Sequence, residues 1–496
     1  MTIISNKMKK HSHESNAGLG VDDGVFSKVI ESKNLKNGVV VGGTFRGHAE
    51  SILKKSTIDR LYGVDPHIYV EGYGNPINLP QEEFDQIHSL AIERLDRYND
   101  KYLHINKISQ DAVNDVPEVD FAFIDAGSSY GSIWENLCIW YSKIRVGGII
   151  GGCGYNHPNS SSVKQAIGEF FRRFDWEIHV GGNGLWWVEK QSLNISFIMP
   201  AYNCEKTVQE SVESIMVDNF IDGDELVIVN DCSTDNTENV LNNLKTKYSL
   251  IKIFKHTQNK GGAAARNTAV ENAQNQLIFC LDSDNVLASG SIQELKLFLE
   301  KSGGDVASFQ ELRYFIDTKE NITHKWIFNP GVTTLADYLS GSVVPGASGN
   351  YMFTRDSWVR AGGYPEFSRA LDAWGFGLRQ VATNSKMMVL PNSFYYHRYG
   401  HESYWIRESK KGQVSFIATQ ILIPFKDIIA DEDLKYMNHN KKWFFDLEKR
   451  PIHLKSGQKG FAGKVSSKTT GITNWKMLHS LSHAFRNMVK YFGGEK

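Results

Sequence analysis

The chain has 496 residues, which is more than one hydrophobic core supports and predicts two domains plus an extension. Hydrophobic residues make up 41% and charged residues 22%, as in ordinary globular proteins, and a net charge of -1 gives no general attraction to nucleic acid. The five cysteines are widely spaced and form no C-x-x-C pair, so neither structural zinc nor a disulfide framework is expected, and a reducing compartment fits.

The N-terminal residues 1–20 are polar, and no apolar core follows their basic residues. We therefore expect a disordered tail there and no secretory signal. No apolar run in the chain approaches the ~18 residues that a membrane span needs. These features predict a cytoplasmic location.

The first domain is expected over residues 21–190, where strand-like and helical patterns alternate. A run of valines at 39–41 leads into a turn that contains Gly43, and a second strand ends at Asp65, 22 residues beyond that glycine. This order of elements is typical of a nucleoside site: a strand, a glycine turn, a helix and a second strand that ends in an acid about 20 residues after the turn. A later strand ends before Asp125. The alternation predicts a doubly wound parallel sheet, while capping or turn formation is the alternative role for both acids.

The stretches at residues 43–48, 61–67, 123–126 and 147–150, with Tyr130, resemble the class I S-adenosylmethionine-dependent methyltransferases. The resemblance covers nearly all of residues 25–190 and implies a Rossmann-like fold. It also implies an S-adenosylmethionine pocket formed by Gly43, Gly47, Asp65 and Asp125.

Three positions depart from that family. Val41 replaces an acid, Gly127-Ser128 replaces an Asp-His pair, and Cys153-Gly154 replaces a His-Asp pair. Each replaced group would have held the amino acid end of the cofactor, a metal or a transferable proton. We therefore expect a methyltransferase-like domain that keeps the fold and no longer transfers methyl groups.

The second domain is expected over residues 194–430, where three strands end in polar groups. The polar groups are Pro200, Ala201 and Tyr202 after the first strand, Asp231 after the second, and Asp282, Ser283 and Asp284 after the third. Open α/β sheets bind ligands at the edge formed by such strand ends. Side chains at i and i+2 of an extended chain share a side, so Asp282 and Asp284 are expected to converge on a divalent cation, or on a cation and a ribose. An exposed turn is the alternative.

A glycine turn precedes the third of these strands. Lys260-Gly261-Gly262 opens a helix that carries Arg266. Glycines allow close approach of the backbone, and a helix N-terminus beside Lys260 and Arg266 favours phosphate oxygens.

These separated motifs resemble the family-2 glycosyltransferases of the GT-A fold, from about Ile195 to His397. By position, the resemblance implies that Pro200, Ala201, Tyr202 and Asp231 surround the uracil and ribose of a UDP-sugar. It places Arg266 near the base or the diphosphate. Asp282, Ser283 and Asp284 would form the Asp-x-Asp motif, with Asp284 as the firmer metal ligand.

Asp372 and His397 complete the predicted site. Residues 371–379 match a segment of that family that usually contains Glu-Asp, with Leu371 in place of the Glu. Asp372 is therefore expected to take the proton of the acceptor hydroxyl in an inverting transfer, and a helix N-cap is its alternative role. The resemblance makes His397 a further metal ligand, with a hydrogen-bonded core histidine as the alternative. Carboxylates with one imidazole suit Mn²⁺ or Mg²⁺.

Residues 431–496 are expected to form a basic, partly amphipathic helical extension. Apolar residues recur at helical spacing from Trp475 to Phe492, among an excess of Lys and Arg. Such a helix either lies on an anionic membrane surface or packs on the catalytic domain.

Taken together, the sequence predicts an α/β protein with a Rossmann-like methyltransferase fold, a GT-A glycosyltransferase fold and a helical C-terminal extension. The expected activity is metal-dependent inverting transfer of a hexosyl or N-acetylhexosaminyl group from a nucleotide donor, UDP by resemblance, to a hydroxyl of a surface glycan or lipid-linked saccharide. The extension would allow peripheral contact with the inner face of the cytoplasmic membrane. One alternative is a bifunctional enzyme that also uses S-adenosylmethionine; another is a non-catalytic scaffold of glycan assembly.

Overall fold

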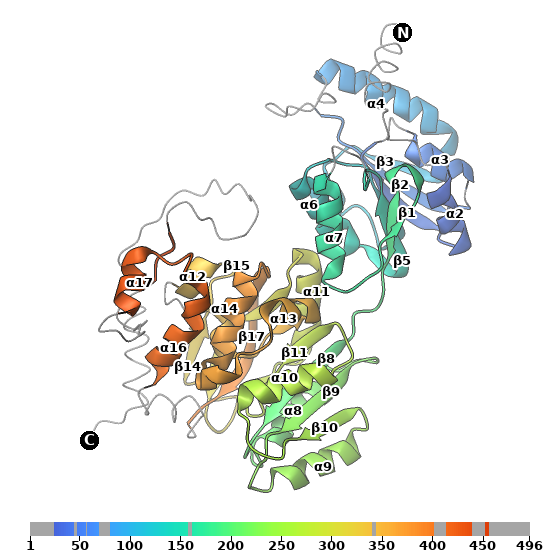
Figure 1. Cartoon of the computed structure of the whole chain (residues 1–496). Helices are drawn as coiled ribbons and strands as arrows, with labels where there is room; N and C mark the ends of the chain where they lie inside the picture. The colour runs from blue at the N-terminus through green and yellow to red at the C-terminus, as the bar shows by residue number, and fades with distance from the viewer. Residues whose placement is uncertain are drawn as a thin grey trace. The chain divides into compact units, whose positions relative to one another are not determined.

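The computed structural model describes residues 24–43, 47–55, 57–68, 80–156, 161–339, 344–400, 413–438 and 452–455. The chain divides into two compact units, Met1–Ser192 and Leu193–Lys496 (Figure 1). The predicted tail at residues 1–20 and the predicted amphipathic helix after Trp475 lie outside the described residues. Within the described part of the chain, none of the helices combines the length and apolar character needed to cross a membrane.

The first unit is built on a seven-stranded sheet. Its strands are β1 (Asn37–Val41), β2 (Arg60–Val64), β3 (Tyr102–Ile105), β4 (Val119–Ile124), β5 (Ile144–Gly152), β6 (His179–Val180) and β7 (Trp186–Glu189). They lie in the order β3-β2-β1-β4-β5-β7-β6. The first five are parallel, and β7 runs antiparallel to both β5 and β6. The sheet therefore contains each strand predicted for this region.

Helices lie on both faces of this sheet (Figure 1). They are α2 (Val25–Ser32), α3 (His48–Lys55), α4 (Gln81–Leu95), α5 (Ser109–Ala112), α6 (Tyr130–Tyr141) and α7 (Ser161–Arg172), with 3-10 turns at Asp96–Tyr98 and Gly182–Gly184. Phe26 of α2 and Ile52 of α3 share a core with Val40 and Phe123 of the sheet, whereas α6 and α7 lie on the other face. Strands covered on both faces read as continuous apolar runs, which explains the valines of β1.

The second unit contains a ten-stranded sheet. Its strands are β8 (Ile195–Ala201), β9 (Glu225–Asn230), β10 (Ile251–Lys255), β11 (Leu277–Cys280), β12 (Val286–Leu287), β13 (Val306–Phe315), β14 (His324–Ile327), β15 (Gly331–Thr333), β16 (Met352–Thr354) and β17 (Met387–Arg398). Eight of them lie in the order β10-β9-β8-β11-β16-β13-β17-β12, while β14 pairs with β13 and β15 with β17. β8 to β11 are parallel, and β16 is antiparallel to β11. The sheet thus has a parallel half and a mixed half.

The helices of this unit fill the connections between its strands. They are α8 (Val208–Met216), α9 (Thr237–Lys247), α10 (Gly262–Asn272), α11 (Ser291–Ser302), α12 (Leu335–Leu339), α13 (Arg355–Ala361), α14 (Asp372–Ala382), α16 (Val414–Leu422) and α17 (Asp431–Met437), with 3-10 turns at Pro345–Ser348, Glu366–Leu371 and Ile423–Phe425. One hydrophobic cluster joins Ala269 of α10, Ile278 of β11 and Phe376 of α14. Met437 and Ile452 belong to that cluster, so the described start of the predicted extension packs into this core.

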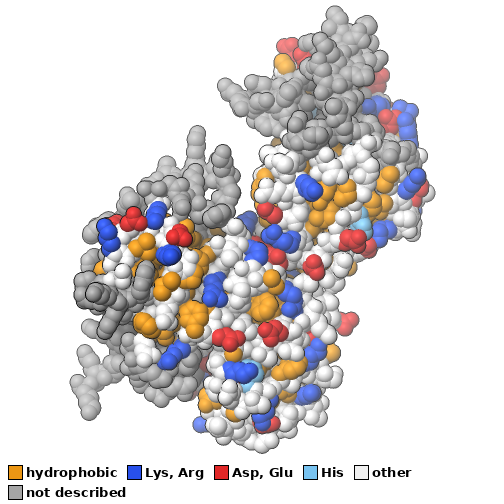
Figure 2. Space-filling view, viewed as in Figure 1, with side chains coloured by type: hydrophobic (Ala, Val, Ile, Leu, Met, Phe, Trp, Pro, Cys, Tyr) orange, Lys and Arg blue, Asp and Glu red, His pale blue; other side chains and the backbone are white. Residues whose placement is uncertain are grey.

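The surface of the second unit carries mixed charge. On the face shown in Figure 2, its Lys and Arg side chains are interspersed with Asp and Glu. This distribution agrees with a net charge near zero, which predicted no general affinity for polyanions.

Candidate active site

The topology of the second unit places one crevice at the carboxyl ends of β8 and β11. β8 has β9 on one side and β11 on the other, because the chain passes outward through β10 and returns through α10. Ligands of open α/β sheets bind where strand order reverses in this way. Pro200, Ala201 and Tyr202 stand at one side of this point, and Asp282 at the other. Tyr202 is 40% exposed, which leaves this aromatic residue accessible to a ligand.

The loops that follow β8 and β9 are tied together. Asn203, with a left-handed φ of 49°, accepts a hydrogen bond through Oδ1 from the backbone N–H of Thr234 at 2.8 Å. Its own backbone N–H donates to Ser233 Oγ at 3.0 Å. The backbone N–H of Asp231 donates to the carbonyl of Ala201 at 2.8 Å. The loops after β8 and β9 therefore form one hydrogen-bonded edge, which includes Ala201 and Asp231 of the predicted nucleoside residues.

The Asp231 carboxylate organises the glycine turn that opens α10. Oδ1 lies 2.7 Å from His256 Nδ1 and accepts from the backbone N–H of Lys260 at 2.9 Å, while Oδ2 accepts from that of Gly261 at 2.8 Å. The side chain is almost fully buried. In this structure Asp231 holds the loop that presents the α10 N-terminus, and its predicted contact with uracil or ribose stays a prediction.

Arg266 joins the two predicted halves of the catalytic centre. Its Nη1 donates to Asp372 Oδ2 and its Nη2 to Asp282 Oδ1, each at 2.5 Å. The exposed fractions of the Arg266, Asp372 and Asp282 side chains are 10%, 8% and 23%. The prediction placed Arg266 near the donor base or diphosphate, and the structure places it between two carboxylates.

Burial sets the electrostatics of this triad. It raises the pKa of Asp372 above the usual range of an aspartate, and the Arg266 guanidinium only partly offsets the effect. Burial disfavours the charged form of Arg266, but Asp372 and Asp282 outweigh it and raise the pKa of Arg266 further. Asp372 is the first residue of α14, and its Oδ1 accepts from the backbone N–H of Ala373 at 2.8 Å. Leu371, not Asp372, occupies the N-cap position.

Two glycines leave room around the guanidinium. A Cβ at Gly262 would lie 2.9 Å from Arg266 Nη1 and 3.1 Å from Asp372 Oδ2. Gly349, with φ of 75°, faces the other side, where a Cβ would lie 3.5 Å from Asp282 Oδ2. A side chain at 262 would crowd the Arg266 guanidinium, whereas position 349 favours glycine because of its positive φ.

Asn350 holds Asp282 and connects it to His397. Asn350 is fully buried; its Oδ1 accepts from the backbone N–H of Asp282 at 2.7 Å, and its Nδ2 donates to Asp282 Oδ2 at 3.3 Å and Tyr395 Oη at 3.3 Å. Tyr395 Oη in turn lies 3.1 Å from His397 Nδ1. His397 is therefore part of the same network as Asp282, at the end of β17.

Asp284 lies on the tight turn between β11 and β12. The backbone N–H of Asn285 donates to the carbonyl of Asp282 at 3.1 Å, and Arg398 Nε donates to the carbonyl of Asp284 at 3.2 Å. Ser283, between the two acids, is half-buried. Asp282, Asp284 and His397 are not among the described groups whose three ligand atoms all lie within 4.8 Å of one another. Their role as a metal set stays a prediction.

The residues predicted for the S-adenosylmethionine pocket lie in the first unit. Gly43 has a φ of 60° and leaves room for the Asp125 carboxylate, because a Cβ there would lie only 2.0 Å from Oδ2. Cys153 Sγ lies 3.0 Å from Asp125 Oδ1, and His48 Nε2 lies 3.4 Å from Oδ2. Gly47 has open space around its Cα.

The Asp65 carboxylate lies beside His67. Its Oδ1 accepts from the backbone N–H of His67 at 3.3 Å, and its Oδ2 lies 3.6 Å from His67 Nε2. Burial lowers the pKa of His67; burial together with nearby His67 and His88 lowers the pKa of His104 to about 4. Ribose binding by Asp65 stays a prediction.

Sequence reasoning missed His256 and the anchoring role of Asn350. His256 follows β10 directly, and its Nε2 reaches Thr268 Oγ1 of α10 at 3.1 Å while Nδ1 holds Asp231. The available signal was a histidine directly after β10, the strand that pairs with the one ending before Asp231.

The sequence of this unit matches a known family. Residues 196–363, about a third of the chain, match the model for glycosyl transferase family 2. The matched segment contains Asp231, Arg266, Asp282 and Asp284, whereas Asp372 and His397 lie beyond its end.

Several glycosyltransferases are similar over part of their length. An uncharacterized glycosyltransferase of Haemophilus influenzae is 35% identical over 105 residues, 21% of this chain and 42% of that protein. The UDP-Glc:alpha-D-GlcNAc-diphosphoundecaprenol beta-1,3-glucosyltransferase WfgD of Escherichia coli is 31% identical over 140 residues, 28% of this chain and 53% of that protein. The chain thus spans about half the length of these relatives or less.

A solved structure is also similar. The crystal structure of Staphylococcus aureus TarS 1–349 in complex with UDP-GlcNAc aligns with a TM-score of 0.39 and 19% identity, over 47% of this chain and 66% of that one. The family match and the curated relatives agree on the class of the second unit. Residues 196–363 are therefore a glycosyltransferase domain of family 2, with a mixed α/β fold of the GT-A type.

Proposed function

We propose that this protein transfers a sugar from a UDP-sugar to a hydroxyl of a surface glycan or lipid-linked saccharide, with inversion and with a divalent cation. The observation that carries the proposal is the Arg266 bridge, in which one guanidinium binds Asp282 at the end of β11 and Asp372 at the start of α14. The bridge brings the acid of the predicted donor side together with the predicted base of the acceptor side.

The donor fits the edge formed by β8, β9 and α10. The exposed ring of Tyr202 offers a stacking surface for uracil. The N-terminus of α10 has no side-chain cap, and the Asp231 carboxylate fixes the turn that precedes it. Free backbone N–H groups at a helix N-terminus favour phosphate oxygens, which supports binding of a diphosphate there.

The donor set at the β11 turn suits a cation that binds together with the diphosphate. Asp284 and Asp282 offer carboxylate oxygens, and His397 offers an imidazole within the same network. Mg²⁺ sites commonly use one or two carboxylates and take their remaining oxygens from substrate phosphates, so these residues fit without a preassembled cage. When bound, the cation supplies positive charge that stabilises the departing diphosphate.

Asp372 is proposed to accept the proton of the acceptor hydroxyl. As that oxygen forms a bond to the anomeric carbon, the bond between this carbon and the UDP oxygen breaks, and the proton remains on the carboxyl group. Burial raises the pKa of Asp372, which brings a carboxylate closer to the basicity that general-base catalysis needs.

The names of the relatives support the substrate classes. WfgD is named for UDP-Glc as donor and a diphosphoundecaprenol-linked sugar as acceptor. Another relative, TarS of Staphylococcus aureus, is named a poly(ribitol-phosphate) beta-N-acetylglucosaminyltransferase. Because a lipid-linked acceptor lies at a membrane surface, we further propose a cytoplasmic enzyme that works at the inner face of the membrane.

The first unit is proposed to keep a methyltransferase-like fold without methyl transfer. The Asp125 carboxylate, which contacts Cys153, lies directly against the glycine turn where the cofactor of that family would be expected. Calorimetric titration of the full chain with S-adenosylmethionine tests this proposal. Micromolar binding together with methyl transfer to a glycan would refute it.

The decisive test of the transferase proposal is a screen of UDP-sugar hydrolysis with Mn²⁺. We expect turnover in the wild-type protein and its loss in Asp284→Ala and Asp372→Asn, with UDP binding kept in Asp372→Asn. Asp222→Asn, an exposed acid in the turn before β9, is the matched control and should keep full activity. Full activity in both site variants would overturn the assignment.

A further inference from the structure

Three histidines of the first unit come together from separate elements. His67 follows β2, His88 lies on α4 and His104 lies on β3. Each offers a ring nitrogen, and these atoms all lie within 4.8 Å of one another. The ring centroids are 5.0 Å apart for His67 and His88, 5.5 Å for His67 and His104, and 4.9 Å for His88 and His104.

These separations match imidazoles arranged around a single metal ion. A Zn–N bond of about 2.0–2.1 Å puts the ring centroid about 3.2 Å from the metal, so a tetrahedral angle separates two centroids by about 5 Å. Simple ring stacking is the competing explanation, because the planes of His67 and His88 are inclined by only 29°. Stacking, however, does not explain why ring nitrogens of this cluster are buried without a hydrogen-bond partner.

The ring nitrogens lack the partners that buried imidazoles usually have. His67 is only 4% exposed, and both of its ring nitrogens are buried without a hydrogen-bond partner. The Nε2 of His104 is likewise buried and unpartnered. Buried polar atoms are nearly always satisfied, and one ion takes one nitrogen from each ring, so the Nδ1 of His67 and the Nε2 of His104 point to a missing ligand.

The surrounding groups suit metal-binding imidazoles. The free Nε2 of His104 is opposite Nδ1, which lies 3.2 Å from the hydroxyl of Tyr102. Asp65 Oδ2 lies 3.6 Å from Nε2 of His67, which leaves the Nδ1 of that ring for a metal. Metal-binding histidines commonly have a carboxylate or another polar group beside the second nitrogen. Gly63 leaves room for the Tyr102 hydroxyl beside His104, because a Cβ at position 63 would lie only 2.0 Å from that hydroxyl.

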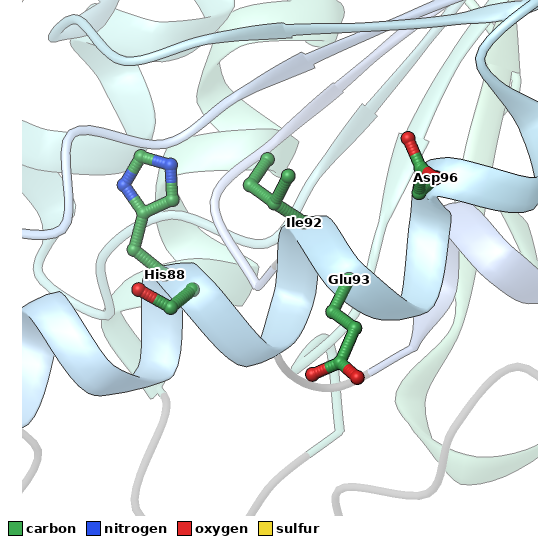
Figure 3. A pocket seen from close by; sticks show the side chains of 5 residues that line it. His88, Ile92, Glu93 and Asp96 are labelled. Carbon is green, nitrogen blue, oxygen red and sulfur yellow. The ribbon is translucent and has the colours of Figure 1, made fainter.

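The backbone at His67 is also unusual. Its φ of 46° is in the left-handed region, which a non-glycine residue rarely adopts. Such a conformation persists only where its surroundings enforce it, often at ligand sites. A pocket of about 470 Å³ opens along α4 and is lined by His88, Ser89, Ile92, Glu93 and Asp96 (Figure 3), so His88 borders open space.

We propose that His67, His88 and His104 form a binding site for one zinc-class divalent cation with an open fourth position. Three imidazoles are soft enough to favour Zn²⁺ or Co²⁺ over Mg²⁺, which separates this site from the carboxylate site proposed in the second unit. The absence of a Cys-x-x-Cys pair argued against structural zinc, and a site made only of histidines is compatible with that sequence observation.

The test uses the full chain, dialysed against chelator and titrated with Co²⁺ and then Zn²⁺. We expect one ion per chain, a visible absorption spectrum of tetrahedral Co²⁺, and displacement of Co²⁺ by Zn²⁺. His88→Gln, on the surface side of the cluster, should lower Zn²⁺ affinity by more than about 100-fold, because even partners outside the ligand set contribute 10–100-fold. Tyr102→Phe should lower it by about 10-fold or more.

His179→Gln is the matched control, since His179 lies in the same unit and stacks on Trp187 at 5.3 Å. It should bind one ion with wild-type affinity. Circular dichroism of each variant checks that the fold is kept. Absence of Co²⁺ absorption in the wild-type chain, or equal affinity in His88→Gln and wild type, would overturn the proposal.

Discussion

Replacing Arg266 by alanine should destabilise the core of the second unit. The change leaves Asp372 and Asp282, with exposed fractions of 8% and 23%, facing each other without the cation that binds both. Removing one member of a buried ion pair typically costs about 3–5 kcal/mol, because a buried charge loses its partner. We expect the free energy of local unfolding of α10 and α14, the two helices that Arg266 connects, to fall by this amount.

Hydrogen exchange followed by mass spectrometry measures this effect locally, which matters because a chain with two units does not unfold in one step. Peptides from α10 and α14 should exchange at least about 100-fold faster in Arg266→Ala than in wild type. Arg266→Lys keeps the charge but loses the fork that reaches both carboxylates, so an intermediate effect is expected.

Lys247→Ala is the control, because Lys247 pairs with Glu213 at 2.9 Å on the exposed surface of α9. Its removal should leave exchange in α10 and α14 unchanged. If Arg266→Ala changed exchange in these helices no more than this control does, the argument from buried charge would be refuted.

Two further predictions concern catalysis. Asn350→Ala removes the side chain that fixes Asp282, so the Mn²⁺ concentration for half-maximal activity should rise by about 10–100-fold, as for other groups that orient metal ligands; an unchanged Mn²⁺ titration would contradict this role. The pKa of Asp372 is raised, and a general base must be ionised to act. As the pH is lowered, kcat/KM should therefore begin to fall at a pH above about 3.9, the usual pKa of an aspartate. A pH profile that is flat down to pH 4 would exclude Asp372 as the base.

Local patterns in the sequence predicted the strands and their polar ends. The apolar runs that stop at Tyr202, Asp231 and Asp282 are local signals, and parallel strands bring their carboxyl ends to one edge. For the same reason Asp231, Asp282 and Asp284 could be named without coordinates, whereas Asp372 was named from the family resemblance. The first unit likewise has the predicted strands, while its link to methyl transfer rests on resemblance alone.

The partners of those acids could not be predicted. Arg266 and Asp372 are 106 positions apart, and their pairing depends on how α10 and α14 pack. The three histidines come from a strand end, a helix and a strand, with no regular spacing that a motif would reveal. Side-chain networks of this kind are set by tertiary packing, which periodicity does not encode.

Gly262 and Gly349 limit how the glycosyltransferase domain can be redesigned. Any larger side chain at 262 would press on the guanidinium, and the backbone at 349 disfavours other residues. Libraries aimed at new donor or acceptor preferences should hold both positions constant and diversify the solvent-facing rim, beginning with Tyr202. New substrate preferences would then come from substitutions in the surrounding loops, while the Arg266, Asp282 and Asp372 triad stays unchanged.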